Sequence, residues 1–243
     1  MKIIQFQESY SSKNLRKYAP WGTAVLLVIL FVMVTIALTL VIPTLRQSKY
    51  LWVVTTIGLI IILISRKYGD PLFDKISGFQ SGKEGEEKIL NMLKETLDDS
   101  YIYVPNYIIP NTRIGDIDGL LLGPKGVIIL EVKNYSGVFD FEAGHMHKKR
   151  GWYNFFELPR PVWQTARQKD FLVKFFKTKG VDVRVMAMLV LAGGKIGKIT
   201  GETGIFITEA SKLTNHIFEL SPITNWSEEM GNKIISALGV SQK

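Results

Sequence analysis

The chain has 243 residues, a length that suits one or two domains, and a formal net charge of +8. It contains no cysteine, which excludes disulfides and cysteine-ligated zinc, and its three histidines are too few for a histidine-rich metal site. Of 30 basic and 22 acidic residues, six basic and one acidic lie in residues 1–65, leaving 24 and 21, a net charge of +3, for residues 66–243. The overall positive charge therefore does not indicate that residues 66–243 bind nucleic acid.

Two uncharged runs predict a membrane anchor. Residues 24–42, AVLLVILFVMVTIALTLVI, would form a helix of about 28 Å, close to the hydrocarbon thickness of a bilayer. Residues 50–65, YLWVVTTIGLIIILIS, are shorter and alone would also suit a buried helix, but following a first span they favour a second. We expect a basic tail at residues 1–20 and a two-span hairpin in the lipid bilayer at residues 21–66. Basic residues on both flanks predict a plasma-membrane protein with both ends in the cytoplasm.

A short juxtamembrane link is expected at residues 67–77, followed by a helix that begins near Ser81 with a capping box. Glu86 falls on the core-facing side of this helix, where a carboxylate requires a partner. A position near the helix start, where the carboxylate meets the helix dipole, explains Glu86 equally well. The apolar stripe of the helix is Ile89, Leu90, Leu93 and Leu97.

The rest of the chain is organised around residues 115–137, GDIDGLLLGPKGVIILEVKNYSG. Two apolar runs, 117–122 and 127–132, are joined by a four-residue Gly/Pro turn, which predicts a β-hairpin. If Leu122 pairs with Val127, Asp118 lies opposite Glu131 and both side chains point to one face. Lys133 is two residues further along and shares that face.

Two opposed carboxylates repel each other, and a proton, a cation or Lys133 would relieve the repulsion. Mg²⁺ or Mn²⁺ suits such a pair, because hard cations bind carboxylates together with water and phosphate oxygens. A lysine beside the cation can polarise water or meet the charge that develops on a phosphate. The spacing alone is equally compatible with an exposed hairpin end that carries solvated charges.

Further elements complete a mixed α/β (α+β) pattern. Strands are expected at residues 101–109, 135–141 (a third strand of a meander), 181–192 (central) and 204–208, and helices at 161–179, 211–220 and 227–238. The last of these helices is expected to be capped by Ser227. The helix at 161–179 carries Gln164 on its inward face. Basic and aromatic residues interleave just before it, which suits nucleic-acid contacts or, equally, a solvated basic turn. The candidate nucleic-acid residues are Lys148, Lys149, Arg150 and Arg167.

Four motifs carry a resemblance to a known family. They are GKEGE (82–86), IDGLLLGPKG (117–126), EVKNYSG (131–137) and PVWQ (161–164). In this order they closely resemble the nuclease-related domain, NERD, which is similar to the PD-(D/E)xK nuclease superfamily. The resemblance covers residues 78–180, with 181–243 completing or extending the domain, and it implies a restriction-endonuclease-like mixed sheet flanked by helices, here preceded by two transmembrane helices.

The resemblance also implies roles for particular residues. Asp118 and Glu131 would bind the metal, Lys133 would be the catalytic lysine, and Glu86 and Gln164 would be additional polar residues of the site. The sequence departs from the superfamily pattern before Asp118, where it has isoleucine and not proline, and from the family's Asn-Pro at residues 160–161, where it has Arg-Pro.

The expected function is that of a membrane-anchored nuclease that depends on Mg²⁺ or Mn²⁺, hydrolyses phosphodiester bonds in DNA or RNA, and forms a possible homodimer. The alternative is a catalytically silent, membrane-anchored protein that uses the same fold to bind nucleic acid or to serve as a scaffold. Metal-dependent cleavage separates the two.

Overall fold

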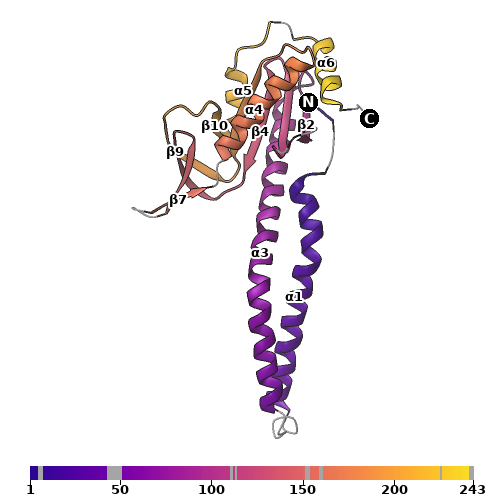
Figure 1. Ribbon diagram of the computed structural model, residues 1–243, viewed down its shortest axis with the longest axis vertical. Coiled ribbons are helices and arrows are strands. Elements are labelled where there is room, and N and C mark those ends of the chain that lie inside the picture. Colours follow the sequence, from indigo (N-terminus) through magenta and orange to yellow (C-terminus); the bar gives the residue numbers. More distant parts are fainter. Residues whose placement is uncertain are drawn as a thin grey trace. The chain divides into compact units, whose positions relative to one another are not determined.

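The computed structural model describes residues 1–4, 8–42, 51–109, 112, 114–150, 154–158, 161–224 and 226–240. The chain divides into two compact units (Figure 1). One unit comprises Met1–Tyr10 together with Ser81–Lys243, and the other comprises Ser11–Gln80.

The smaller unit is a helical hairpin built from α1 (Tyr10–Val41) and the first part of α3 (Leu51–Thr96). The helices pack closely where a Cβ added to Gly58 would lie 3.2 Å from Val32. Away from this seam the large apolar side chains face outward, with Phe31 73% and Trp52 79% exposed. The hairpin therefore presents an apolar outer surface.

Among the residues that the structure describes, one helix is long and apolar enough to cross a membrane, and it covers Tyr10–Thr39. It contains residues 24–39 of the first predicted span, which was expected at residues 24–42. The second predicted span, residues 50–65, lies in α3 from Leu51 onward, and its role as a span stays a prediction.

The predicted break between the second apolar run and the next helix is wrong. α3 continues from Leu51 to Thr96, so the expected link at residues 67–77 is helical and Pro71 lies inside the helix. Ser81 is not an N-cap, because its hydroxyl donates to the backbone oxygen of Asn134 at 3.0 Å. Proline and a serine three residues before an acid are typical of helix starts, but here neither interrupts the helix.

The larger unit is built on a sheet of six strands. The sheet is mixed, as predicted, and with its flanking helices it fits a nuclease-like fold. The strand order is β1-β2-β3-β4-β8-β10. β2, β3 and β4 are antiparallel, whereas β8 runs parallel to both β4 and β10. The bounds are β1 Lys2–Ile3, β2 Ile102–Ile108, β3 Asp116–Gly123, β4 Gly126–Lys133, β8 Val185–Leu191 and β10 Phe206–Glu209.

Helices cover both faces of this sheet. On one face, the last turns of α3 pack through Ile89 and Leu93, and α5 (Ala210–Glu219) packs beside them through Leu213. α4 (Pro161–Thr178) and α6 (Glu228–Leu238) pack on the other through Leu172, Phe176 and Ile234. The predicted cap of the last helix is confirmed, since the Ser227 hydroxyl accepts from the backbone N–H of Met230 at 3.1 Å.

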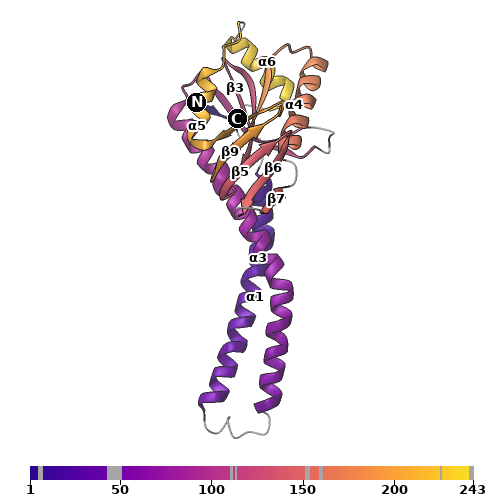
Figure 2. The same cartoon turned by 90° about the vertical axis from the view of Figure 1, so that its left-hand side faces the viewer.

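The predicted meander is wrong, because β5 (Gly137–Glu142) leaves the main sheet. It joins a second sheet of order β7-β6-β5-β9 (Figure 2), with β6 at His145–Arg150, β7 at Asn154–Leu158 and β9 at Gly194–Thr200. The place beside β4 is taken by β8, VMAMLVL, whose continuous apolar run suits a strand that is buried on both faces. β5 and β9 follow β4 and β8 along the chain and again pair in parallel.

The first residues of the chain, predicted as part of a basic tail, join the domain. β1 pairs in parallel with β2, through bonds from the N–H of Lys2 to the oxygen of Tyr101 and from the N–H of Ile4 to the oxygen of Tyr103, both 2.9 Å. The segment before α1 and the segment after α3 thus belong to one folded unit.

Candidate functional site

The candidate site lies where β3 begins and β4 ends. The predicted hairpin register is confirmed, because Leu122 pairs with Val127 and the ladder runs on to Gly119 and Leu130. Leu120 and Ile129 belong to the core under α4 and α6. Since side chains alternate along a strand, Asp118, Glu131 and Lys133 continue the face that α4 covers.

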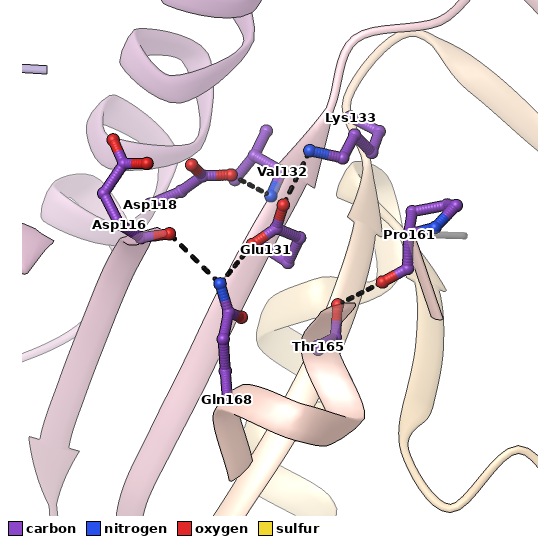
Figure 3. Close-up of polar contacts among 8 residues, drawn as sticks. All are labelled: Asp116, Asp118, Glu131, Val132, Lys133, Pro161, Thr165 and Gln168. Atoms are coloured by element: carbon purple, nitrogen blue, oxygen red, sulfur yellow. Dashed lines mark hydrogen bonds and ion pairs between the residues drawn. The ribbon is translucent and has the colours of Figure 1, made fainter. Parts of the chain in front are cut away.

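Glu131 is fully buried, and both of its oxygens are engaged (Figure 3). Lys133 Nζ donates to Oε1 at 2.6 Å, and Gln168 Nε2 donates to Oε2 at 3.1 Å. A buried carboxylate is tolerated only when charge and hydrogen bonds compensate for its lost hydration. Lys133 supplies the charge, and Gln168 supplies the second donor.

Asp118 is held differently from the predicted pairing. The β3–β4 ladder stops at Gly119 and Leu130, and the Asp118 Oδ2 atom accepts the backbone N–H of Val132 at 2.7 Å. Burial is the main cause that raises the pKa of Asp118 well above its usual value, and the negative charge of Glu131 raises it further. Lys133 and the Val132 N–H only partly offset these effects. The ionised pair is therefore unfavourable, and a bound cation would relieve it.

Lys133 remains a cation in this setting. Burial lowers the pKa of its ammonium group, but the charges of Glu131 and Asp118 outweigh burial, so that the pKa is raised above the ordinary lysine value. The side chain is 22% exposed, so part of it is open to solvent. Lys133 can therefore offer protons and positive charge to an anionic ligand that enters the site.

The first motif, GKEGE, brings α3 against the end of β4. A Cβ added to Gly85 would lie 2.7 Å from the Cβ of Asn134, so only glycine allows this approach. The contact is fixed by Ser81 and Asn134, since the Ser81 hydroxyl donates to the Asn134 backbone oxygen and Asn134 Nδ2 returns a bond to the Ser81 oxygen at 2.9 Å. Glu86 follows directly, half-buried, and its charge contributes to the raised pKa of Asp118.

The glycine after Asp118 also has a steric role. A Cβ added to Gly119 would lie 2.6 Å from Cζ of Tyr103, so the tyrosine ring covers this backbone. Burial, followed by the charges of Asp118 and Glu86, raises the pKa of the Tyr103 hydroxyl above its usual value. Tyr103 thus lies in the same electrostatic environment as the two carboxylates, although no motif drew attention to it.

On α4 the structure brings a different glutamine to Glu131 from the one that the family motif indicates. Gln164 is half-buried near the helix start, whereas Gln168, one turn later, is fully buried and contacts Glu131. The spacing of four residues places both on one helix face, and this was the available signal for Gln168. The motif gave no reason to choose it.

The predicted nucleic-acid residues are placed only in part. Lys148 on β6 lies 5.9 Å from the ring centroid of Phe139, and Arg167 is exposed on α4. Lys149 and Arg150 belong to β6, but their side chains lie outside the described residues. Their contact with nucleic acid stays a prediction.

Within the part of the chain that the structure describes, no three His, Cys, Asp or Glu side chains are grouped closely enough to hold a metal ion. The candidate metal ligands are therefore the two carboxylates of Asp118 and Glu131. Such a pair fits Mg²⁺, which is commonly bound through one or two carboxylates and keeps several waters.

Comparison with known proteins bears on the same segment. Residues 81–192 match the family model of NERD, described as nuclease-related domain. No curated protein and no solved structure matches the chain. The match begins where α3 enters the larger unit and ends just after β8, so it includes every element that contributes to the site, and it supports the assignment of this segment to the family.

Proposed function

We propose that this protein is a membrane-anchored nuclease that uses Mg²⁺ or Mn²⁺ to hydrolyse phosphodiester bonds in nucleic acid. The observation that carries the proposal is the convergence of Asp118, Glu131 and Lys133 on one face at the end of the β3–β4 hairpin, within the nuclease-related segment. Two carboxylates can bind the divalent metal ion, and the ammonium group of a lysine beside them can stabilise negative charge on the phosphate.

Asp118 and Glu131 would hold the divalent cation. The fit rests on their hard oxygen donors and on the repulsion, visible in the raised pKa of Asp118, that a cation would relieve. When bound, the cation supplies a Lewis acid that lowers the pKa of water and neutralises charge on the phosphate.

The other residues would act around this pair. Lys133 would donate hydrogen bonds to a phosphate oxygen as negative charge develops there, which is the role that best suits an ammonium that keeps its proton because its pKa is raised. Glu86 and Gln164 would orient water from α3 and α4 respectively. Basic side chains would position the nucleic-acid backbone through contacts that weaken with salt, and we assign this role to Lys148, Lys149, Arg150 and Arg167.

The experiment that tests this function is a cleavage assay on the full chain. Full-length protein is required, because β1 forms part of the sheet. A shortened protein that began after the helical hairpin of α1 and α3 would lack this strand. In detergent or nanodiscs, labelled single- and double-stranded DNA and RNA should be cut in Mg²⁺ or Mn²⁺, and not in EDTA. Retained binding without cleavage in any metal would favour the catalytically silent alternative. Size measurement of the same sample tests the predicted homodimer.

The anchor is proposed as a two-span hairpin, and the pairing of β1 with β2 supports it. Paired strands must lie on the same side of a membrane, so the chain between them crosses an even number of times. If α1 crosses once, the apolar part of α3 must return. The outward-facing apolar side chains of both helices agree with this, since a water-soluble hairpin would hide them.

Single-cysteine labelling tests the number of spans and their direction, because the chain has no cysteine of its own. We expect Ser48→Cys, between the two apolar runs, to react with an impermeant maleimide in intact cells. Ser211→Cys, on the exposed side of α5, should react only after lysis. Equal labelling of both in intact cells would contradict two spans, and the reversed pattern would contradict the cytoplasmic placement of the domain.

A further inference from the structure

Gln168 has an unusual hydrogen-bond arrangement for a fully buried side chain. Its Nε2 makes two bonds, one to Oε2 of Glu131 and one to the backbone oxygen of Asp116, each 3.1 Å long (Figure 3). These bonds use both amide protons. They tie the start of β3, the end of β4 and α4 together at the candidate site.

The other half of the same amide is unsatisfied. Gln168 Oε1 is buried and accepts no hydrogen bond from any residue that the structure describes. Exchanging the two amide atoms would not help, because Oε1 would then face the carboxylate of Glu131, acceptor against acceptor. A buried acceptor without a donor is costly, so this atom calls for a ligand that carries an O–H or N–H group.

The Thr165 hydroxyl, on the same helix, is already committed, because it donates to the Pro161 oxygen at 2.8 Å. Lys133 donates to Glu131 Oε1 and, among the described residues, neither it nor any other side chain donates to Gln168 Oε1. Water is the donor that the proposed site would bring with it. A cation held by only two carboxylates keeps several hydration waters, and each water has protons to donate.

We propose that Gln168 is a positioning residue of the metal site. Nε2 fixes the rotamer of Glu131, and Oε1 accepts a hydrogen bond from a hydration water of the divalent cation held by Asp118 and Glu131. This inference rests on the proposed function and deepens it, because it adds an outer ligand from α4 that lies four residues beyond the glutamine of the motif. Residues that hold metal ligands from behind commonly change metal affinity by about 10–100-fold.

The test uses Mn²⁺ alone as the probe. Binding to the full chain in nanodiscs is followed by loss of the free Mn²⁺ signal in electron paramagnetic resonance. Gln168→Met keeps the length of the side chain without the amide, and we expect its Kd for Mn²⁺ to rise about tenfold or more. Gln168→Asn keeps the amide but shortens the side chain, and should weaken binding similarly. Thr165→Val is the matched control, because it also removes a buried polar group from α4 but breaks a bond within the helix.

Each outcome bears on the proposal. Weaker Mn²⁺ binding in both Gln168 variants, with normal binding and unchanged thermal unfolding in Thr165→Val, supports it. In a Glu131→Gln background, Gln168→Met should then have no further effect on Mn²⁺ binding. If wild type binds Mn²⁺ and cuts nucleic acid while both Gln168 variants bind as tightly as the control, this inference alone is overturned. If wild type binds no Mn²⁺ at all, the metal dependence of the proposed function is wrong and the inference falls with it.

Discussion

Replacing Glu131 by glutamine should reduce metal-dependent cleavage by about 10²–10³-fold or more, the usual effect of removing one strong electrostatic contributor from an active site. Glutamine has the same shape but no charge, so the proposed metal would lose one of two carboxylates. The fold should persist, because Gln168 can still donate to the new side-chain oxygen and Lys133, 22% exposed, can turn its ammonium to water.

Cleavage rates with saturating Mg²⁺, measured beside thermal unfolding, check this result. Glu142→Gln is the matched control, since Glu142 is an exposed acid on β5, outside the site. Its rate should equal that of wild type. Cleavage at the wild-type rate in Glu131→Gln would remove Glu131 from the mechanism, whereas loss of folding in that variant would show that its role is structural.

The β3–β4 hairpin could be predicted because its two strands and its turn are neighbours in the sequence. Two apolar runs separated by a Gly/Pro turn fix the register, and the pattern predicted the pairing of Leu122 with Val127 that the structure contains. A register fixed in this way brings Asp118, Glu131 and Lys133 to one face without knowledge of the rest of the fold. The capping of the last helix by Ser227 was predictable for the same reason.

Features that depend on distant partners were not predictable. The sequence of β5 is as suitable for a strand beside β4 as for the second sheet, and the competing strand β8 lies some 50 residues further along. Two residues, Lys2 and Ile3, are too few to indicate a strand, yet they pair with β2, although the whole helical hairpin lies between them in the sequence. Ser81 shows the same limit, because its hydroxyl binds Asn134, 53 residues away.

The choice between Gln164 and Gln168 illustrates why sites are harder to predict than folds. Both glutamines lie on the inward face of α4, and helix periodicity treats them alike. The two glutamines differ in which turn of α4 lies beside the end of β4. That position depends on how Leu172 and Phe176 of α4 pack in the core. That packing is a property of the assembled domain.

Asp118→Asn should make the metal-free protein more stable while removing its stabilisation by metal. The pKa of Asp118 is raised in the folded protein, chiefly by burial and then by Glu131, so ionisation of this carboxyl opposes folding. Asparagine removes that charge, and its side-chain oxygen can still accept the Val132 N–H. In EDTA at neutral pH we expect the apparent Tm to rise, by about 2–4 °C for each kcal/mol gained in a domain of this size.

The pH dependence distinguishes this cause from a general effect on packing. Because the folded protein holds the Asp118 proton more tightly than the unfolded chain does, wild type loses stability as the pH rises from the ordinary aspartate value of about 3.9 through the raised value. The advantage of Asp118→Asn should therefore be absent at low pH, grow across that window and then stay constant. Asp182→Asn, at an exposed aspartate, should follow the wild-type curve at every pH.

Adding metal should reverse the difference in thermal stability, so that wild type becomes more stable than Asp118→Asn. Mg²⁺ or Mn²⁺ at about 100 times its Kd stabilises a folded protein by about 2.7 kcal/mol, and wild type should gain this while Asp118→Asn should not. Thermal unfolding with and without metal measures both effects in one experiment. An Asp118→Asn protein that is less stable than wild type in EDTA would show that the carboxylate holds the hairpin end together. A variant that still gains the full metal shift would place the cation elsewhere, because a site formed by two carboxylates cannot lose one and keep its affinity.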